Sequence, residues 1–227
     1  MSIDDLKKAA AEKAVEQVKS GMVLGLGTGS TTHYAIAKIG ELWQAGHLTD
    51  ICCIPTSEDT VQEARRYQLP LTDLNEQPVI DLAIDGADEV DPQLNLIKGL
   101  GGALLREKIV ETAAKSFVVI VDDRKVVQKL GTNGPLPVEV VQFGWKIQLR
   151  WLSDLGCLPA LRGGERDPFI TDNGNYIIDC KFPNGIADPT GLAAILAGRP
   201  GIIEHGLFLG LASQVIIARP EGLHFLP

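Results

Sequence analysis

Short apolar runs, each long enough for one buried strand, alternate with stretches of helical spacing over the first 121 residues. The strands predicted from these runs occupy 22–26, 51–54, 70–74, 79–84 and 117–121. The helices predicted between and before them occupy 4–19, with Ser2 as N-cap, a stretch ending at 43, 58–67 and 104–115. Strands that alternate with helices in this way predict an α/β fold with a doubly wound parallel sheet.

The pattern changes near Gly131, where Gly134-Pro135-Leu136-Pro137 has the composition of a hinge. The elements predicted beyond it are a strand at 137–142, a helix at 145–155, a hairpin turning at Asn173-Gly174, a helix at 189–196 and a strand at 202–209. We therefore expect a Rossmann-like domain of 1–130 plus 206–227, completed by a last strand at 215–218, and a small α+β (ferredoxin-like) lobe of 131–205.

Composition narrows the classes of function. Hydrophobic residues make up 45% of the 227 and charged residues 22%, as in an ordinary globular protein. The net charge of −8 argues against a nucleic-acid partner, which needs a basic face, but leaves a small anionic substrate possible. The acidic, helical N-terminus is unlike a signal peptide, and no apolar run has the length of a membrane span. We expect a cytoplasmic protein with no membrane partner.

The cysteines and histidines indicate no metal site. None of the four cysteines has metal-ligand spacing, and Cys52-Cys53 stand side by side in an apolar strand. The four histidines do not cluster with them. Buried free thiols in a reducing compartment explain the cysteines better.

A glycine-rich loop joins the first predicted strand to the helix that follows. In Gly25-Leu26-Gly27-Thr28-Gly29-Ser30-Thr31 the glycines let the backbone approach a ligand, and the helix N-terminus suits a phosphate. A Walker A loop is excluded because no lysine precedes Lys38, and a dinucleotide loop because its third glycine is replaced by Ser30. A tight turn with Ser and Thr caps remains the bland alternative.

The stretch from Asp85 to Val110 is too polar to be core. Asp85 stands at the carboxyl end of a predicted strand, where open α/β sheets bind ligands. Each residue also has a bland interpretation. Asp85-Gly86 can be a turn and Asp88 a helix cap, Lys98 a surface lysine paired with Asp91, and Glu107 a solvated helix acid.

Several motifs taken together resemble ribose-5-phosphate isomerases of the A type, nearly from end to end. They are GLGTGST (25–31), PTSEDT (55–60), IDGADEVD (84–91), IKGLGGALLREKIV (97–110), GPLPVEV (134–140) and TDNGNYIID (171–179). The resemblance implies interconversion of ribose 5-phosphate and ribulose 5-phosphate through an enediolate, without metal or cofactor. It also implies a role in the non-oxidative pentose phosphate pathway and the Calvin cycle, and a homodimer or homotetramer.

The resemblance also assigns roles to individual residues. It makes Glu107 the general base and Asp85, Asp88 and Lys98 its catalytic partners. A carboxylate in partly apolar surroundings is a stronger base than a free one, and an ammonium group suits the charge of an enediolate. The substrate-contacting positions that it implies are Lys7, Thr28, Gly29, Ser30, Thr31, Asp85, Gly86, Ala87, Asp88, Lys98, Gly99, Leu100, Gly101 and Lys125.

Leu100 departs from the glycine that some members of the family have at this position. A positive φ there would strain leucine, so we expect that only a neighbouring N–H is used. Two other functions stay open. A non-catalytic sugar-phosphate sensor of the same fold would not need Glu107. A related deaminase or lactonase would place a histidine near the reacting carbon, whereas His33 and His205 lie outside the motifs.

Overall fold

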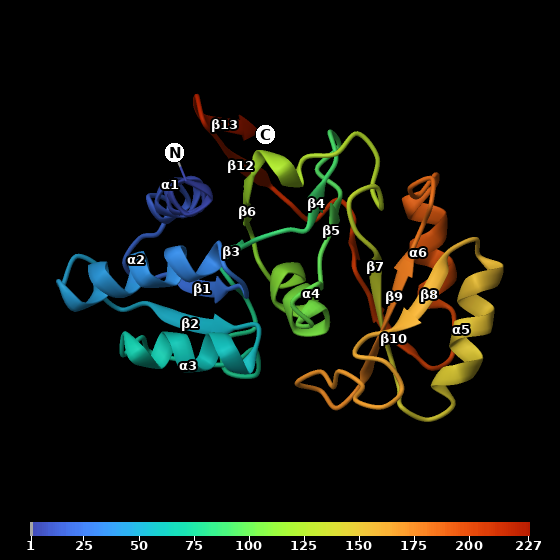
Figure 1. Cartoon of the computed structure of the whole chain (residues 1–227). Coiled ribbons are helices and arrows are strands. Elements are labelled where there is room, and N and C mark those ends of the chain that lie inside the picture. The colour runs from blue at the N-terminus through green and yellow to red at the C-terminus, as the bar shows by residue number, and fades with distance from the viewer. Residues whose placement is uncertain (1) are drawn as a thin grey trace. The chain divides into compact units, whose positions relative to one another are not determined.

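The computed structural model describes residues 2–227, and its chain divides into two units (Figure 1). The first unit consists of Met1–Ala87, Arg106–Arg124 and Leu211–Pro227. The second consists of Asp88–Leu105 and Lys125–Gly210. These units differ from the domains expected from the sequence, because residues 88–105, 125–130 and 206–210 belong to the second unit.

A six-stranded sheet forms the centre of the first unit. Its order is β13-β12-β6-β3-β1-β2, and all neighbours are parallel except β12 and β13. The predicted doubly wound parallel sheet is therefore confirmed. The strands are β1 (Val23–Leu26), β2 (Cys52–Pro55), β3 (Leu82–Asp85), β6 (Phe117–Asp122), β12 (Gln214–Arg219) and β13 (Gly222–Leu226).

The strand order reverses between β1 and β3, since β2 continues to one side of β1 and β3 begins the other side. In open α/β sheets ligands bind at such a switch point, beyond the carboxyl ends of the strands. The loops that follow β1 and β3 begin at Gly27 and Gly86. The topology thus singles out two of the segments that the sequence marked as chemical.

Helices cover both faces of this sheet because its side chains alternate between two apolar clusters. Leu24 and Leu26 of β1 join the cluster of α1 (Ile3–Val15) and α2 (Thr32–Gln44). Gly25 faces the other way, where an added Cβ would be 2.8 Å from Val110 of α4 (Leu104–Thr112). The remaining helix is α3 (Glu58–Arg66).

Two of these helices begin at a capping serine, and in α1 it is the Ser2 that the sequence predicts. Ser2 accepts a hydrogen bond from Asp5 N–H, and the Asp5 carboxylate accepts one from Ser2 N–H, a capping box. Ser57 accepts from the N–H of Thr60 at the start of α3. Such caps satisfy N–H groups that have no partner inside the helix.

The second unit contains two antiparallel sheets. The larger has the order β10-β7-β9-β8 and the smaller β11-β5-β4. Along the chain the larger sheet and its helices follow the order β-α-β-β-α-β of ferredoxin-like folds. Its elements are β7 (Leu136–Val140), α5 (Trp145–Asp154), β8 (Leu158–Leu161), β9 (Tyr176–Lys181), α6 (Pro189–Ala197) and β10 (Ile202–His205), and the smaller sheet has β4 (Glu89–Val90), β5 (Leu96–Ile97) and β11 (Leu207–Phe208).

Three predicted strands differ from the observed ones. The strand predicted at 70–74 is reduced to one bridge between Leu71 and Cys53. The predicted hairpin keeps its turn, but Ile170 forms only a bridge with Tyr176, and β9 pairs with β7 and β8. The strand predicted at 202–209 is divided at Gly206, where an added Cβ would be 2.3 Å from the carbonyl oxygen of Lys98.

Candidate active site

The loop after β1 is fastened to the ends of its two neighbouring strands. Gly27 N–H donates to the carbonyl of Ile84 in β3, at 3.0 Å. Thr28 Oγ1 donates to Ser57 Oγ, which follows β2, at 2.8 Å. Thr60 Oγ1, in the first turn of α3, donates to the carbonyl of Gly27 at 2.8 Å. The predicted glycine-rich loop therefore has a fixed path at the carboxyl edge of the sheet.

Asp85 is a buried carboxylate at the end of β3, with 1% of its surface exposed. Its Oδ1 accepts hydrogen bonds from Thr28 N–H (3.1 Å), Thr32 Oγ1 (3.1 Å) and its neighbour Gly86 N–H (2.6 Å). Three donors on this one oxygen offset part of the cost of burying the charge. The structure thus joins two predicted site residues, Thr28 and Asp85, and Asp85 does more than begin a turn.

Gly27 has no room for a side chain, because an added Cβ would be 2.0 Å from the carboxyl carbon of Asp85. Gly29 has a φ of +118°, in the region that favours glycine. At both positions a side chain would clash or strain the backbone, so glycine is required for steric reasons.

Lys7 of α1 reaches the same loop from the N-terminal helix. Its Nζ donates to Ser30 Oγ at 2.9 Å. Thr31 precedes α2 and its side chain makes no capping hydrogen bond. An ammonium group, hydroxyls and a helix N-terminus thus meet at the loop of the first unit, and this combination of donors suits a phosphate.

Glu107 lies in the first turn of α4, in the first unit, and only 5% of its surface is exposed. The interpretation of Glu107 as a solvated helix acid is therefore wrong. The positive end of the helix dipole favours a carboxylate at this position. The neighbouring Arg106 pairs with Glu58 of α3 at 2.8 Å.

A second group of predicted residues belongs to the second unit. Asp88 Oδ2 accepts the N–H of Leu100 at 2.9 Å, and Lys125 Nζ lies 4.0 Å from Asp88 Oδ1. Lys98 is 3% exposed, and its Nζ lies 5.5 Å from the centre of the Phe208 ring. Lys98 is therefore not the surface lysine of the bland interpretation.

Asp91 has a structural task of its own. Its Oδ1 accepts the N–H groups of Gln93 and Asn95, both at 2.9 Å. This is the pattern of an Asx turn, in which the side chain of Asp91 holds the turn that follows β4.

The glycine segment, residues 99–102, has its positive φ angles at glycines and not at Leu100. Gly99 has a φ of +104° and Gly102 of +89°, whereas Leu100 is not among the residues with positive φ. Leucine is therefore unstrained at this position, as the sequence led us to expect.

Glu89 is a buried carboxylate beside Asp88 that the sequence analysis did not select. It is 1% exposed, and its carboxylate accepts the N–H groups of Gly131 (2.6 Å), Asn133 (2.6 Å) and Gly134 (2.9 Å). The one signal in the sequence that could have identified Glu89 is that an acid stands in a short buried strand. The partners lie more than 40 residues along the chain, so no local pattern reveals them.

Neither a metal cluster nor a membrane span is found in the described part of the chain. Within residues 2–227 no group of three or more His, Cys, Asp or Glu side chains could hold a metal ion. Over the same residues no helix combines the length and apolar character needed to cross a bilayer.

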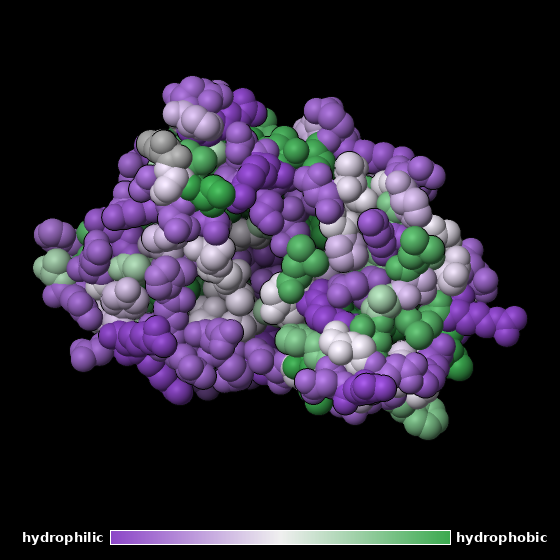
Figure 2. Space-filling view, in the orientation of Figure 1, coloured by the Kyte–Doolittle hydropathy of each residue, from purple (hydrophilic) through white to green (hydrophobic). Residues whose placement is uncertain are grey.

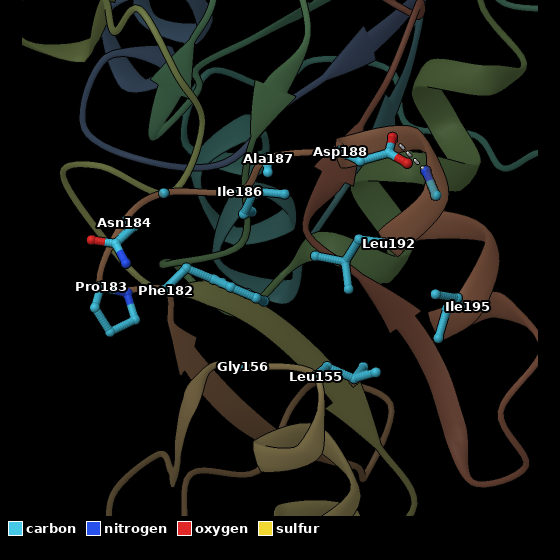
Figure 3. Close-up of a pocket in the computed structure, with 12 residues that line it drawn as sticks. Leu155, Gly156, Phe182, Pro183, Asn184, Ile186, Ala187, Asp188, Leu192 and Ile195 are labelled. Carbon is cyan, nitrogen blue, oxygen red and sulfur yellow. Dashed lines mark hydrogen bonds between the residues drawn. The ribbon is translucent and has the colours of Figure 1, made fainter.

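A pocket of about 400 Å³ lies in the second unit (Figure 3). Phe182, Ile186 and Leu192 surround it, while Asp188 turns its carboxylate to the N–H of Gly191, at 2.9 Å. None of the predicted site residues lines this pocket.

The first unit is a doubly wound α/β sheet with a glycine-rich loop and the buried carboxylate of Asp85 at its switch point, which is where such folds bind ligands. The family model of ribose 5-phosphate isomerase A (phosphoriboisomerase A) matches residues 52–222. The chain belongs to the ribose 5-phosphate isomerase A family.

Relatives with known names cover the whole chain. A probable ribose-5-phosphate isomerase 3, chloroplastic, of Arabidopsis thaliana is 53% identical over 100% of this chain and 84% of its own length. A ribose-5-phosphate isomerase A of Synechococcus sp. (strain JA-3-3Ab) is 52% identical over 99% of this chain and 98% of its own.

Solved structures agree with the fold. A D-ribose-5-phosphate isomerase in complex with phospho-erythronic acid has a TM-score of 0.96 and 45% identity, covering 100% of this chain and 99% of that one. The ribose 5-phosphate isomerase from Plasmodium falciparum has a TM-score of 0.95 and 40% identity, covering 98% of both chains.

Proposed function

We propose that this protein interconverts D-ribose 5-phosphate and D-ribulose 5-phosphate through an enediolate, in the non-oxidative pentose phosphate pathway. The observation that carries the proposal is identity of about half over the full length to proteins named for this reaction. The buried carboxylates and the lysine that the reaction needs are all present in this sequence.

Glu107 is the proposed general base. The reaction moves a proton between adjacent carbons, so one base removes it from C2 and returns it to C1. Burial at 5% exposure keeps water from solvating the carboxylate, which makes it a better base than an exposed acid. Its place in the first turn of α4 fixes its backbone in a helix.

Lys98 is the proposed electrostatic partner of the enediolate. As negative charge gathers on the oxygens at C1 and C2, a nearly buried ammonium group stabilises it more than a solvated one would. Asp85 and Asp88 are proposed to hold sugar hydroxyls and to move protons when the furanose ring opens. The backbone of Gly86 and Ala87 joins them in the substrate-contacting segment.

The phosphate is assigned to the loop of Thr28 to Thr31, with Lys7 and Lys125 as its cationic partners. The contact of Lys7 Nζ with Ser30 supports the first cation, and the start of α2 adds a partial positive charge. A related structure is named for its complex with phospho-erythronic acid. That compound combines a phosphate with a carboxylate whose charge resembles an enediolate, which suits such a site.

The alternative functions are less well supported. A non-catalytic sensor would not need a buried acid at 107. A deaminase or lactonase would need a histidine at the reacting carbon. His33, however, pairs with Glu63, a carboxyl whose pKa is raised by burial, and His205 Nδ1 accepts the N–H of Leu207.

Substitution of Glu107 tests the assignment. Glu107→Gln keeps the shape of the side chain but removes the base, so we expect kcat for ribose 5-phosphate to fall by about 10³-fold or more, with substrate binding nearly intact. The measurement is a coupled assay of ribulose 5-phosphate formation with a metal chelator present, paired with calorimetric titration of the substrate.

Glu111→Gln is the matched control, because Glu111 is buried in the same helix and has no proposed role. It should retain most of the turnover. Substantial activity of Glu107→Gln would overturn the choice of base. Loss of wild-type activity on adding chelator would contradict the proposal that no metal or cofactor takes part.

We further propose that the protein assembles as a homodimer or homotetramer. Figure 2 shows apolar atoms at the surface around α5 and α6, where Phe143 is 93% and Ile147 62% exposed. Exposed apolar surface of this kind is typical of protein–protein contacts. A cytoplasmic location stays a prediction, as does a role in the Calvin cycle, which the chloroplastic relative supports.

A further inference from the structure

Arg162, which follows β8, uses its guanidinium group at two places at once. On one side it forms a forked ion pair with Asp179 of β9, with Nε to Oδ2 at 3.0 Å and Nη2 to Oδ1 at 2.6 Å. On the other side Nη1 donates to the backbone carbonyls of Gly99 (3.1 Å) and Leu100 (3.0 Å). All four residues belong to the second unit.

The surroundings of Arg162 hold it rigidly. Its N–H donates to the carbonyl of Ile177 and its carbonyl accepts the N–H of Phe169, both at 2.9 Å. The guanidinium carbon lies 5.6 Å from the centre of the Phe169 ring. The same ring packs against Gly102, where an added Cβ would be 2.5 Å from it. Arg162 thus contacts the glycine segment at Gly99, and Phe169 contacts it at Gly102.

The hydrogen bonds from Arg162 fix the orientation of the two peptide groups whose carbonyls belong to Gly99 and Leu100. In a trans peptide the C=O and the N–H point in opposite directions. The peptide between Gly99 and Leu100 turns its carbonyl to Arg162 and its N–H to the carboxylate of Asp88. The next peptide also turns its carbonyl to Arg162, so the N–H of Gly101 points away from the guanidinium. Within residues 2–227 no acceptor for that N–H is found.

We propose that Arg162, held by Asp179, is a positioning residue that aims the Gly101 N–H at the substrate oxygen on which charge develops. This inference rests on the proposed isomerase function, in which Asp88 and the segment from Lys98 to Gly101 contact the sugar. A fixed backbone donor stabilises an oxyanion without reorganising during the reaction. Only arginine has the planar fork that reaches a carboxylate and two carbonyls together.

The test separates turnover from binding. Arg162→Lys keeps the charge but loses the fork, and we expect kcat to fall by about 10²-fold while KM changes by less than about threefold, as for loss of an oxyanion donor. Asp179→Asn should give the same split with a smaller fall. In Arg162→Ala, guanidinium ions added at concentrations far below denaturing ones should restore part of kcat.

Arg199→Ala is the control, since Arg199 donates to Gln148 and stacks on Trp151 in the same unit without touching the glycine segment. It should retain the wild-type kcat and show no response to guanidinium. Wild-type kcat in Arg162→Lys would overturn the inference, as would a fall that matches a loss of thermal stability and resists guanidinium rescue. A wild-type protein that does not convert ribose 5-phosphate would instead overturn the proposed function.

Discussion

At the scale of single residues, the first unit depends on a glycine and a carboxylate that fit each other. Gly27 leaves the space that the carboxyl group of Asp85 fills, and Asp85 in return orders the loop through the N–H of Thr28. The sequence predicted Asp85 as a site residue and placed Gly27 in the glycine-rich loop. It did not predict that this loop contacts Asp85, because 57 positions separate Thr28 from Asp85.

Gly27→Ala is therefore expected to damage the site more than the fold. The new Cβ must displace Asp85, and a shift of about 1 Å at a reacting group costs about 10²-fold in kcat/KM. Overpacking should also lower stability, by about 1–3 kcal/mol. Gly198→Ala is the control, because its Cβ would meet only two carbonyl oxygens, at 3.6 and 3.8 Å. The activity and the melting temperature of both variants are measured. Equal activity of the two variants would contradict this account of Gly27.

At the scale of elements, side-chain bonds fix how strand ends meet the turns beside them. Asp81, just before β3, accepts the N–H of Val23 at the start of β1 (2.9 Å) and pairs with Lys115 before β6 (2.7 Å). The bond from Lys115, followed by that from Val23, lowers the pKa of Asp81 below its ordinary value of 3.8. One carboxylate thus ties three neighbouring strands together.

This pair predicts a pH dependence of stability. A carboxyl with a lowered pKa in the folded state stabilises the fold above its unfolded pKa, and that contribution is lost as the pH falls through the folded value. Asp81→Asn should cost about 1 kcal/mol at neutral pH, given the exposure of Lys115. The difference from the wild type should shrink when urea unfolding is repeated at about pH 3. Asp167→Asn, an exposed acid, should cost little at either pH, and a constant deficit in Asp81→Asn would refute the linkage.

At the scale of the whole molecule, the chain leaves its first unit and comes back to it. Strand β12 pairs in parallel with β6 and so returns to the first unit, as the sequence predicted for 215–218, but β13 follows it as a further strand that the sequence did not predict. The second unit carries most of the large exposed apolar side chains, including Phe143, Ile147 and Leu158. A monomer rarely leaves such groups in water, so the molecule is expected to bury them against another copy.

Light scattering tests this expectation. We expect a mass of two or four times the 24.4 kDa of one chain. Ile147→Lys should shift the mass toward that of one chain, because a charge in an apolar contact is costly to desolvate. Val79→Lys, at an apolar position of the first unit that is 50% exposed, is the matched control and should leave the mass unchanged. A wild-type monomer would contradict the proposed assembly.

The sequence by itself determined what is local and periodic. Apolar runs at strand spacing predicted the parallel sheet, Ser2 predicted the start of α1, and the glycine-rich loop predicted a tight turn at the carboxyl end of β1. These features depend on residues within a few positions of one another. The sequence therefore suffices for them.

Only the tertiary structure decided which polar groups are buried and what holds them. No local sequence pattern reveals that Glu107 is 5% exposed or that Glu89 accepts three N–H groups. The same is true of the hydrogen bond from Arg162 to Gly99, 63 positions away. Strands β4 and β5, of two residues each, also exist only through their partners. Hydrogen bonds between distant segments form when the chain folds, because a buried polar group must find its partner wherever the fold brings one.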